Sequence, residues 1–340
     1  MAREGILIVG CGKQAEKHIN GLRKAGLENI VLNDIDADRA RALAKTSDLP
    51  WLENFEAALS DEGIVAVDIC TPTPSHYPLA KASLSAKKHV FCEKPLCETS
   101  TQARELAQLA RTNERACAVG FIYRFAPAFE LLKDIVDGQG RGADKPLGEI
   151  LCATLKVGGR GSHAAWKHTS ATGGGAVNEM LVHMVDLAMW LFGKDGEVEL
   201  LVKRLLRPTR MIGGEEIAAD AEDYVVLKTD LGGVESLIEA NLVTPAFLQQ
   251  VLVQGSNGSF AGSIQKIMPN YMFLIDECGK FNAGMTELSF DDNDLFAKQM
   301  TDFAKTIRDP NHQSRSTAED SVRLLELIEN VRSATPHTNG

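Results

Sequence analysis

The sequence predicts an α/β protein: a doubly wound parallel sheet in the first half, followed by an α+β domain with an open, mostly antiparallel sheet. Two observations carry this prediction. Over the first 120 residues, short apolar runs alternate with amphipathic stretches, a pattern typical of parallel strands connected by helices. In the second half, longer strand-like runs are separated by turn signals such as Gly232-Gly233 and Asn257-Gly258, which favour antiparallel hairpins.

Five apolar runs predict the strands of the parallel sheet: Ile6–Val9, Ile30–Leu32, Val65–Ile69, Val90–Phe91 and Ala116–Val119. The amphipathic stretches between them predict its helices: Gln14–Ala25, Ala37–Lys45, Pro78–Ser85 and Thr101–Arg111. Because such helices connect successive parallel strands, we expect them on both faces of the sheet.

The second half is predicted to begin with a helix over Pro127–Val136. Its predicted strands are Glu149–Val157, Glu197–Leu206, Tyr224–Thr229, Val234–Leu242 and Leu248–Gln254. The remaining predicted elements are the helices Ala176–Phe192, Asp294–Arg308 and Thr317–Arg332, and a frayed polar tail, Thr335–Gly340. We expect residues 1–122 to form one domain and 123–334 a second, with the closing helices 294–334 packing back on the first.

Composition and charge narrow the class of protein. The length of 340 residues predicts about two domains, and 44% hydrophobic with 24% charged residues excludes wholesale disorder. With 36 basic and 46 acidic side chains the net charge is −10, which argues against nucleic acid or an anionic membrane surface as the main partner. Neither a signal peptide nor an apolar run of ~18 residues, as a membrane span requires, is recognisable.

The cysteines and histidines indicate thiols rather than disulfides or metal ligands. Seven scattered cysteines, an odd number, suit a reducing cytoplasm, where we expect this protein to reside. Cys92 and Cys97 have no second Cys/His pair to complete a tetrahedral site, and His163 and His168 lie in a glycine-containing loop. We therefore expect no bound metal.

The first predicted strand runs into Gly10-Cys11-Gly12-Lys13-Gln14-Ala15, the G-x-G-x-x-A pattern of a dinucleotide-binding turn. Gly10 allows the tight turn, Gly12 lets the backbone approach a pyrophosphate, and the small Ala15 lets helix and strand pack closely. The phosphates would sit on the free N–H groups at the helix N-terminus. We therefore expect Gly10, Gly12, Lys13 and Gln14 to bind the cofactor.

Asp34 ends the second predicted strand, 22 residues after Gly12. An acid there can accept hydrogen bonds from the adenosine ribose hydroxyls and would repel the 2′-phosphate of NADP, so NAD is the favoured cofactor. The alternative role for Asp34 is to cap the helix Ala37–Lys45, but Asp36 fills that role better.

Two further segments follow predicted parallel strands, at the edge where doubly wound sheets bind ligands. One is the turn that contains Thr71, Pro72 and His76, and the other is Glu93-Lys94-Pro95. The first could be only a rigid corner, and the second only an exposed ion pair. Their position favours cofactor contact for Thr71, Pro72, His76, Glu93 and Lys94.

The predicted helix Ala176–Phe192 carries ionisable residues on a face opposite its apolar stripe. At about 100° per residue, Glu179, His183 and Asp186 fall together with Trp190 on that face. Nearly all other positions are apolar, so the helix should be buried and its ionisable groups paired or used. Glu179 and His183, at i and i+4, can reach the same point. The spacing alone leaves open whether this pair is structural or catalytic.

These features together resemble the Gfo/Idh/MocA oxidoreductases. The resemblance spans nearly the whole chain and is carried by a series of motifs: Gly10–Ala15 with His18, Thr71-Pro72…His76, Glu93-Lys94-Pro95, Tyr123-Arg124-Phe125, Trp166-Lys167, Gly173-Gly174-Gly175, Glu179…His183…Asp186 and Gln254–Gly258. It implies a Rossmann domain, a second domain with an open antiparallel sheet, and NAD(P)-dependent chemistry on sugars, inositols or nucleotide sugars. It also implies that Lys94 is catalytic.

The chain departs twice from the family pattern Gly-Gly-Gly-x-x-x-Asp-x-Gly-x-His-x-x-Asp, with Glu179 for the first aspartate and Leu181 for the glycine after it. The expected reaction is oxidation of a secondary alcohol on a cyclic polyol. His183 would take the hydroxyl proton, Lys94 would stabilise the developing alkoxide, and Glu179 would orient His183 or the substrate. The residues expected to bind the substrate are Tyr123, Arg124, Trp166, Lys167 and Asp186, although surface stacking and salt bridging explain several of them equally well.

Two other functions stay open at this stage: an NAD-dependent glycosidase of the same family, which would form no net NADH, and a non-catalytic ligand sensor. Retention of Lys94 and His183 speaks against the sensor. The resemblance also implies a homodimer or homotetramer that pairs through the open sheet.

Overall fold

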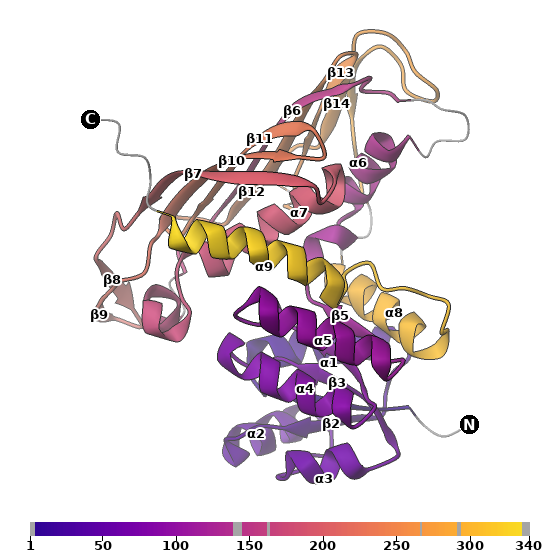
Figure 1. Cartoon of the computed structure of the whole chain (residues 1–340), viewed down its shortest axis with the longest axis vertical. Helices are drawn as coiled ribbons and strands as arrows, with labels where there is room; N and C mark the ends of the chain where they lie inside the picture. The colour runs from indigo at the N-terminus through magenta and orange to yellow at the C-terminus, as the bar shows by residue number, and fades with distance from the viewer. Residues whose placement is uncertain (1–3, 139–144, 162–163, 266, 291–293, 335–340) are drawn as a thin grey trace. The chain divides into compact units, whose positions relative to one another are not determined.

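The computed structural model describes residues 4–138, 145–161, 164–265, 267–290 and 294–334, so the predicted tail Thr335–Gly340 lies outside the described residues (Figure 1). The chain divides into two compact units: unit 1 is Met1–Ile122 with Asp294–Leu325, and unit 2 is Tyr123–Asn293 with Glu326–Gly340. No helix formed by the described residues is long and apolar enough to cross a membrane.

Unit 1 contains a five-stranded parallel sheet with the strand order β2-β1-β3-β4-β5, which confirms the predicted doubly wound sheet. Its strands are β1 (Gly5–Val9), β2 (Ile30–Asn33), β3 (Ile64–Ile69), β4 (His89–Cys92) and β5 (Cys117–Val119). All five residues of β1 are buried, as expected for a parallel strand covered on both faces. The β1–β3 pair lies at the crevice where the strand order reverses, the point at which such sheets bind ligands.

The helices of unit 1 are α1 (Lys13–Lys24), α2 (Ala37–Ser47), α3 (Phe55–Ser60), α4 (His76–Ser85), α5 (Ser100–Thr112) and α8 (Leu295–Arg308), with a 3₁₀ turn at Thr73–Ser75. Asp36 caps α2, because its carboxylate accepts the N–H groups of Asp38 and Arg39. Helix α8 packs on α1 at Gly21, where a Cβ would come within 2.9 Å of the Phe296 carbonyl oxygen. Helix α3 was not predicted from the sequence.

Unit 2 contains an eight-stranded sheet with the order β15-β14-β13-β12-β6-β11-β10-β7. All neighbouring pairs are antiparallel except β6 and β11, which confirms the mostly antiparallel prediction. The strands are β6 (Ile150–Gly158), β7 (Gly196–Arg204), β10 (Tyr224–Leu231), β11 (Val234–Asn241), β12 (Leu248–Gly255), β13 (Gly258–Gly262), β14 (Tyr271–Leu274) and β15 (Gly284–Glu287). A separate hairpin joins β8 (Thr209–Ile212) to β9 (Glu215–Ala218).

Helix α7 (Val182–Phe192) packs on β6, β10 and β11 and covers one face of this sheet (Figure 1). The remaining helical elements are α6 (Pro127–Asp137), α9 (Ala318–Ser333), the 3₁₀ turns Ile122–Phe125, Ala165–His168 and Ser170–Thr172, and a π-helical turn, Val177–Leu181. The single α-helix predicted over Ala176–Phe192 is therefore wrong in its first turn. A π turn contains more residues than an α turn, so angles counted at about 100° per residue do not apply across it.

Candidate active site

The glycine-rich turn between β1 and α1 fits a dinucleotide. Gly10 has φ +96°, and a Cβ there would lie 2.9 Å from the Cys70 carbonyl carbon, so only glycine is tolerated. A Cβ on Gly12 would meet nothing within 4 Å. Gly12 is also the N-cap of α1, and no side chain of the described residues caps that helix. The backbone N–H groups of Lys13 and Gln14 lie in the first turn of α1, where helix N–H groups lack an intrahelical partner and can bind an anion.

Asp34 is fixed beside this turn. Its carboxylate accepts the Cys11 N–H at 2.7 Å and the Asp36 N–H at 2.9 Å, and its side chain is partly exposed. A carboxylate has about four lone-pair sites, so acceptor capacity is left for two ribose hydroxyls. The residues present thus fit the adenosine end of NAD.

His76 connects the two other predicted cofactor segments. It is 1% exposed, and its ring nitrogens lie 2.7 Å from the Thr71 carbonyl oxygen and 2.8 Å from that of Pro95. Burial lowers the pKa of His76, although both carbonyl contacts oppose this effect. The structure therefore brings Thr71 and Pro95 together through a buried imidazole, which leaves little of His76 exposed to a ligand.

Glu93 joins the Lys94 segment to α1. Its Oε1 accepts a hydrogen bond from the Gln14 side chain at 2.9 Å, and its Oε2 accepts the Lys94 backbone N–H at 3.1 Å. Two residues that the sequence predicted separately, Gln14 of the glycine turn and Glu93, are thus in direct contact.

A buried polar cluster behind Glu93 was not predicted as part of the site. His18 and Asp68 are both 0% exposed, and the His18 Nδ1 lies 3.0 Å from each Asp68 oxygen and 3.2 Å from the Cys70 Sγ. The His18 Nε2 lies 3.1 Å from the Glu93 Oε1. The available signal was Asp68 itself, a charged residue inside the apolar run Val65–Ile69.

The electrostatics of this cluster favour an imidazolium between two carboxylates. Burial alone would lower the pKa of His18, but the charges and hydrogen bonds of Asp68 and Cys70 together outweigh burial and raise that pKa well above its ordinary value. Burial opposes ionisation of Glu93 as well, yet the contact with His18, together with the charge and backbone N–H of Lys94, lowers the pKa of Glu93 to about 2. Burial raises the pKa of the Cys70 thiol to about 12.

The donor atoms of His18, Asp68 and Cys70 lie within 4.8 Å of one another, a spacing that a metal ion could use. These atoms already contact one another, since the His18 Nδ1 lies within hydrogen-bond distance of Asp68 and Cys70, so we describe the cluster as a hydrogen-bonded ion network. The absence of a metal site stays a prediction. Of the other residues considered for it, His163 lies outside the described residues, Cys92 and Cys97 are buried, and His168 contacts the Gly161 carbonyl oxygen at 3.1 Å.

In unit 2, two predicted residues stack on each other. The ring centroids of Tyr123 and His183 are 4.9 Å apart with planes tilted by 34°. Tyr123 is 5% exposed, and burial raises the pKa of its hydroxyl. His183 lies in the first turn of α7, directly after the π turn that carries Glu179.

Lys167 and Glu179 form an ion pair at 2.5 Å, with side chains 17% and 9% exposed. The Lys167 ammonium also lies 5.3 Å from the centre of the Trp166 ring, which is 39% exposed. All three residues were predicted from the sequence, but Glu179 was expected to pair with His183, and that contact stays a prediction.

Arg124 and Asp186 form a bidentate pair in the interior of unit 2, with Nε···Oδ2 at 3.0 Å and Nη2···Oδ1 at 2.6 Å. Each side chain is only 2% exposed. Since buried charges are retained when they are paired and hydrogen-bonded, this pair can fix the helix that carries His183. Its burial favours such a role over the direct substrate contact that the sequence predicted.

The glycines before the π turn allow close backbone contacts. A Cβ on Gly174 would lie 2.6 Å from the carbonyl groups of Trp166 and Lys167. Gly175 has φ +102°, and a Cβ there would lie 2.3 Å from the Glu222 carboxylate, which accepts the Val177 N–H. The triplet thus packs the Lys167 turn against the helix start that carries Glu179.

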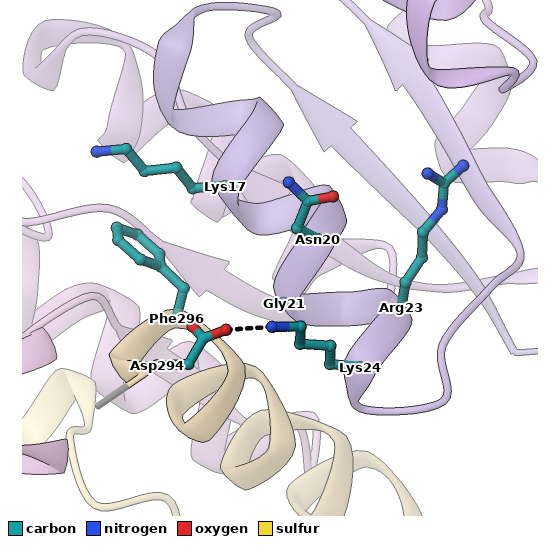
Figure 2. A pocket seen from close by; sticks show the side chains of 7 residues that line it. All are labelled: Lys17, Asn20, Gly21, Arg23, Lys24, Asp294 and Phe296. Carbon is teal, nitrogen blue, oxygen red and sulfur yellow. Dashed lines mark hydrogen bonds and ion pairs between the residues drawn. The ribbon is translucent and has the colours of Figure 1, made fainter. Parts of the chain in front are cut away.

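Unit 1 also has a surface groove of about 460 Å³ between α1 and α8 (Figure 2). Its lining residues are Lys17, Asn20, Gly21, Arg23, Lys24, Asp294 and Phe296. Lys24 pairs with Asp294 at 2.5 Å, and the Lys17 ammonium lies 5.1 Å from the centre of the Phe296 ring. None of the predicted site residues lines this groove.

The parallel sheet, the glycine-rich turn and the acid at the end of β2 define an NAD-binding oxidoreductase domain. Consistent with this class, residues 5–121 match the family model described as "Oxidoreductase family, NAD-binding Rossmann fold", and residues 141–261 match that of the "GFO/IDH/MocA C-terminal domain". The chain belongs to the Gfo/Idh/MocA oxidoreductase family.

Among its curated relatives, the chain is 27% identical over 285 residues to an uncharacterized oxidoreductase, YrbE, of Bacillus subtilis (strain 168), covering 78% of this chain and 80% of that protein. It is 28% identical over 269 residues to the inositol 2-dehydrogenase of Rhizobium meliloti (strain 1021), covering 78% and 76%. Among solved structures, levoglucosan dehydrogenase in complex with NADH and levoglucosan superposes with a TM-score of 0.84 at 18% identity, over 97% of this chain and 96% of that one. At that identity the likeness shows the fold alone.

Proposed function

We propose that this protein is an NAD-dependent dehydrogenase that oxidises a secondary hydroxyl of a sugar or inositol, or catalyses the reverse reduction. The observation that carries the proposal is the Gln14–Glu93 hydrogen bond, which connects the glycine-rich turn to the Lys94 segment within unit 1. The curated relative named inositol 2-dehydrogenase supports a polyol as the substrate.

The proposal assigns residues 1–122 to the cofactor and 123–334 to the substrate. Gly10, Gly12 and the first-turn N–H groups of Lys13 and Gln14 would hold the pyrophosphate, Asp34 the ribose, and Thr71 and Pro72 the neighbouring part of the dinucleotide. When bound, NAD supplies the acceptor for the hydride that leaves the substrate carbon.

The chain's own residues accept the proton of the substrate hydroxyl and stabilise the charge on its oxygen. His183 takes the hydroxyl proton as the carbon–hydrogen bond breaks, a general-base role that imidazoles commonly perform in enzymes. The Lys94 ammonium stabilises the negative charge that develops on the substrate oxygen. Glu179 holds Lys167 in place, and Tyr123 supports the His183 ring by stacking.

The charges in unit 2 favour an uncharged substrate within this class. Arg124 is committed to Asp186, and Lys167 to Glu179, so each cation already has a carboxylate partner. A sugar phosphate would have to displace one of these carboxylates, whereas neutral hydroxyls can hydrogen-bond to the partly exposed Lys167–Glu179 pair as it stands. We therefore propose a free polyol rather than a sugar phosphate or nucleotide sugar.

The test is a spectrophotometric screen for NADH formation with inositols, hexoses, hexose phosphates and UDP-sugars, run with NAD and with NADP. We expect turnover with NAD and a neutral polyol. Lys94→Ala should lower kcat at least a hundredfold and leave NAD affinity nearly unchanged, because it removes only charge stabilisation of the transition state. Lys45→Ala, an exposed lysine of α2, is the matched control and should retain full activity.

Other results would contradict the proposal in distinguishable ways. Cleavage of a glycoside without net NADH would indicate a glycosidase, and polyol binding without turnover would indicate a sensor. An active Lys94→Ala variant would remove Lys94 from the mechanism.

A further inference from the structure

His18 follows the glycine-rich turn in α1 and has no role in the proposed function. It projects from α1 into a fully buried site and is contacted by Asp68 and Cys70 from the end of β3, and by Glu93 from the end of β4. Phe91 of β4 and Phe296 of α8 close the site, with ring centroids 5.5 Å and 5.8 Å from that of His18.

Glu93 transmits this contact to the Lys94 segment. Its Oε1 is held by His18 at 3.1 Å and Gln14 at 2.9 Å, while its Oε2 accepts the Lys94 N–H at 3.1 Å. Gly120 lies beside the same carboxylate, since a Cβ added there would lie 3.2 Å from the Glu93 Oε2. A rotation of the carboxylate would therefore break contacts on both oxygens.

We propose that His18 is a positioning residue for the Lys94 segment: by holding the Glu93 carboxylate from inside unit 1, it fixes the backbone at Lys94 and ties that segment to the glycine-rich turn. This inference rests on the proposed function, in which Lys94 acts on the substrate hydroxyl. His18 itself is fully buried and touches neither substrate nor cofactor in this role.

The charge balance explains why a histidine is needed at this position. Asp68 is fully buried and cannot stay ionised without a cation beside it, and Glu93 is 9% exposed. An imidazolium donates one N–H to each carboxylate, whereas a neutral imidazole has a single N–H to donate. The raised pKa of His18 and the lowered pKa of Glu93 agree with that arrangement.

The experiment compares His18→Gln with His312→Gln. The control removes a histidine of unit 1 that also pairs with an aspartate, Asp302 at 2.9 Å, without contact to the Lys94 segment. For His18→Gln, we expect kcat to fall at least tenfold with the Kd for NADH changed less than threefold. Hydrogen exchange of the amides from Glu93 to Cys97 should accelerate at least tenfold in the same variant, and neither quantity should change in the control.

A double-mutant cycle tests the route through Glu93. If His18 acts through that carboxylate, His18→Gln/Glu93→Gln should be no slower than Glu93→Gln alone, whereas independent effects would multiply. A loss of kcat smaller than tenfold in His18→Gln, or multiplicative losses in the cycle, would overturn the inference.

Two further outcomes are covered by the design: a His18→Gln variant that does not fold, and a wild-type protein without activity. Should His18→Gln fail to fold, Glu93→Gln, which keeps the shape of the side chain, must show the same exchange and kcat effects, and a wild-type-like result would overturn the inference. Should the wild-type protein oxidise no polyol at all, the proposed function fails separately. The exchange measurement then decides on its own whether His18 holds the Lys94 segment.

Discussion

At the scale of single residues, the three glycines at 173–175 have different surroundings. Gly174 lies against backbone carbonyls that cannot move without shifting the Trp166–Lys167 turn. Gly175 combines a positive φ with the nearby Glu222 carboxylate, whereas Gly173 has φ +75° in open space. The sequence offered the triplet only through its family resemblance, because close backbone approach depends on partners that are not adjacent in the chain.

These environments predict unequal effects of substitution. Gly174→Ala places a methyl group 2.6 Å from the Lys167 and Trp166 carbonyls and should destabilise the protein by about 1–3 kcal/mol, as overpacking does. It should also lower kcat, because the Lys167–Glu179 pair shifts with the turn. Gly173→Asn is the control, since asparagine tolerates a positive φ and meets no neighbour there, and should stay within about 0.5 kcal/mol. Urea unfolding measures the free energy of unfolding of both variants. Equal losses of stability in the two variants would contradict this account.

At the scale of elements, the sequence predicted the strands of unit 1 well, because strands covered on both faces are continuous apolar runs. It missed α3, whose six residues are too few to show helical periodicity, and the four- and five-residue strands β13–β15. The Gly213-Gly214 turn between β8 and β9 was a usable hairpin signal. The π turn could not be predicted from the sequence. In a segment that is apolar on nearly all sides, the spacing of polar residues does not distinguish a π turn from an α turn.

The candidate site likewise contains residues that the local sequence predicts and contacts that depend on distant parts of the chain. Local pattern identified the glycine-rich turn and Asp34, whose chemistry is contained in a few adjacent residues. The partner of Asp68 was not predictable, because His18 lies 50 residues away and the contact depends on how α1 crosses the sheet. Likewise Lys167 and Glu179 were both named, but their pairing depends on the fold of the glycine triplet between them.

The ion network that joins α1, β3 and β4 predicts that the free energy of unfolding of unit 1 decreases in acid. The pKa of Glu93 is about 2 in the folded chain, below its ordinary value of 4.5, so this carboxylate stabilises the fold above pH 4.5. That contribution is lost as the pH falls toward 2 and amounts to about 3 kcal/mol. The raised pKa of His18 acts in the opposite sense: its contribution is complete below the ordinary histidine pKa and is lost as the pH rises through the raised value.

Comparison with Glu93→Gln isolates this effect from the other carboxylates. The difference in free energy of unfolding between wild type and variant should shrink by about 3 kcal/mol between pH 7 and pH 2. Hydrogen exchange of the β1 amides through global opening reports on unit 1. A difference that does not change with pH would show that Glu93 has an ordinary pKa in the folded chain.

At the scale of the whole molecule, the face of the eight-stranded sheet opposite α7 carries exposed apolar side chains: Leu201, Leu237, Phe273 and Met285 are 37%, 47%, 42% and 66% exposed. Phe273 and Met285 are direct cross-strand neighbours on β14 and β15. The ion pairs Lys156–Glu239 and Lys228–Glu235 lie among the same strands. Because exposed apolar side chains on a sheet face favour burial against a partner, we propose that a second copy of this chain covers the face.

This proposal predicts an assembly that charge can disrupt. Light scattering should give a mass at least twice the 36.9 kDa of one chain for the wild type, and about one chain for Leu237→Lys/Phe273→Lys, because two buried ammonium groups cannot be solvated in an interface. Leu52→Lys, at an exposed leucine of unit 1, should leave the assembly intact. A wild-type protein that runs as a single chain would contradict the proposal.

The division of unit 1 into two stretches of sequence has a consequence for its synthesis. Met300, Phe303 and Ala304 of α8 belong to the same apolar core as Ile6, Ile8 and Ile19, yet residues 123–293 are made between them. At ribosomal speeds that interval lasts roughly ten to thirty seconds. During it, the nascent sheet and α1 have left the ribosome while the helix that completes their core does not yet exist. The N-terminal domain is therefore one of the last parts of this chain to finish folding, although it is the first to be translated.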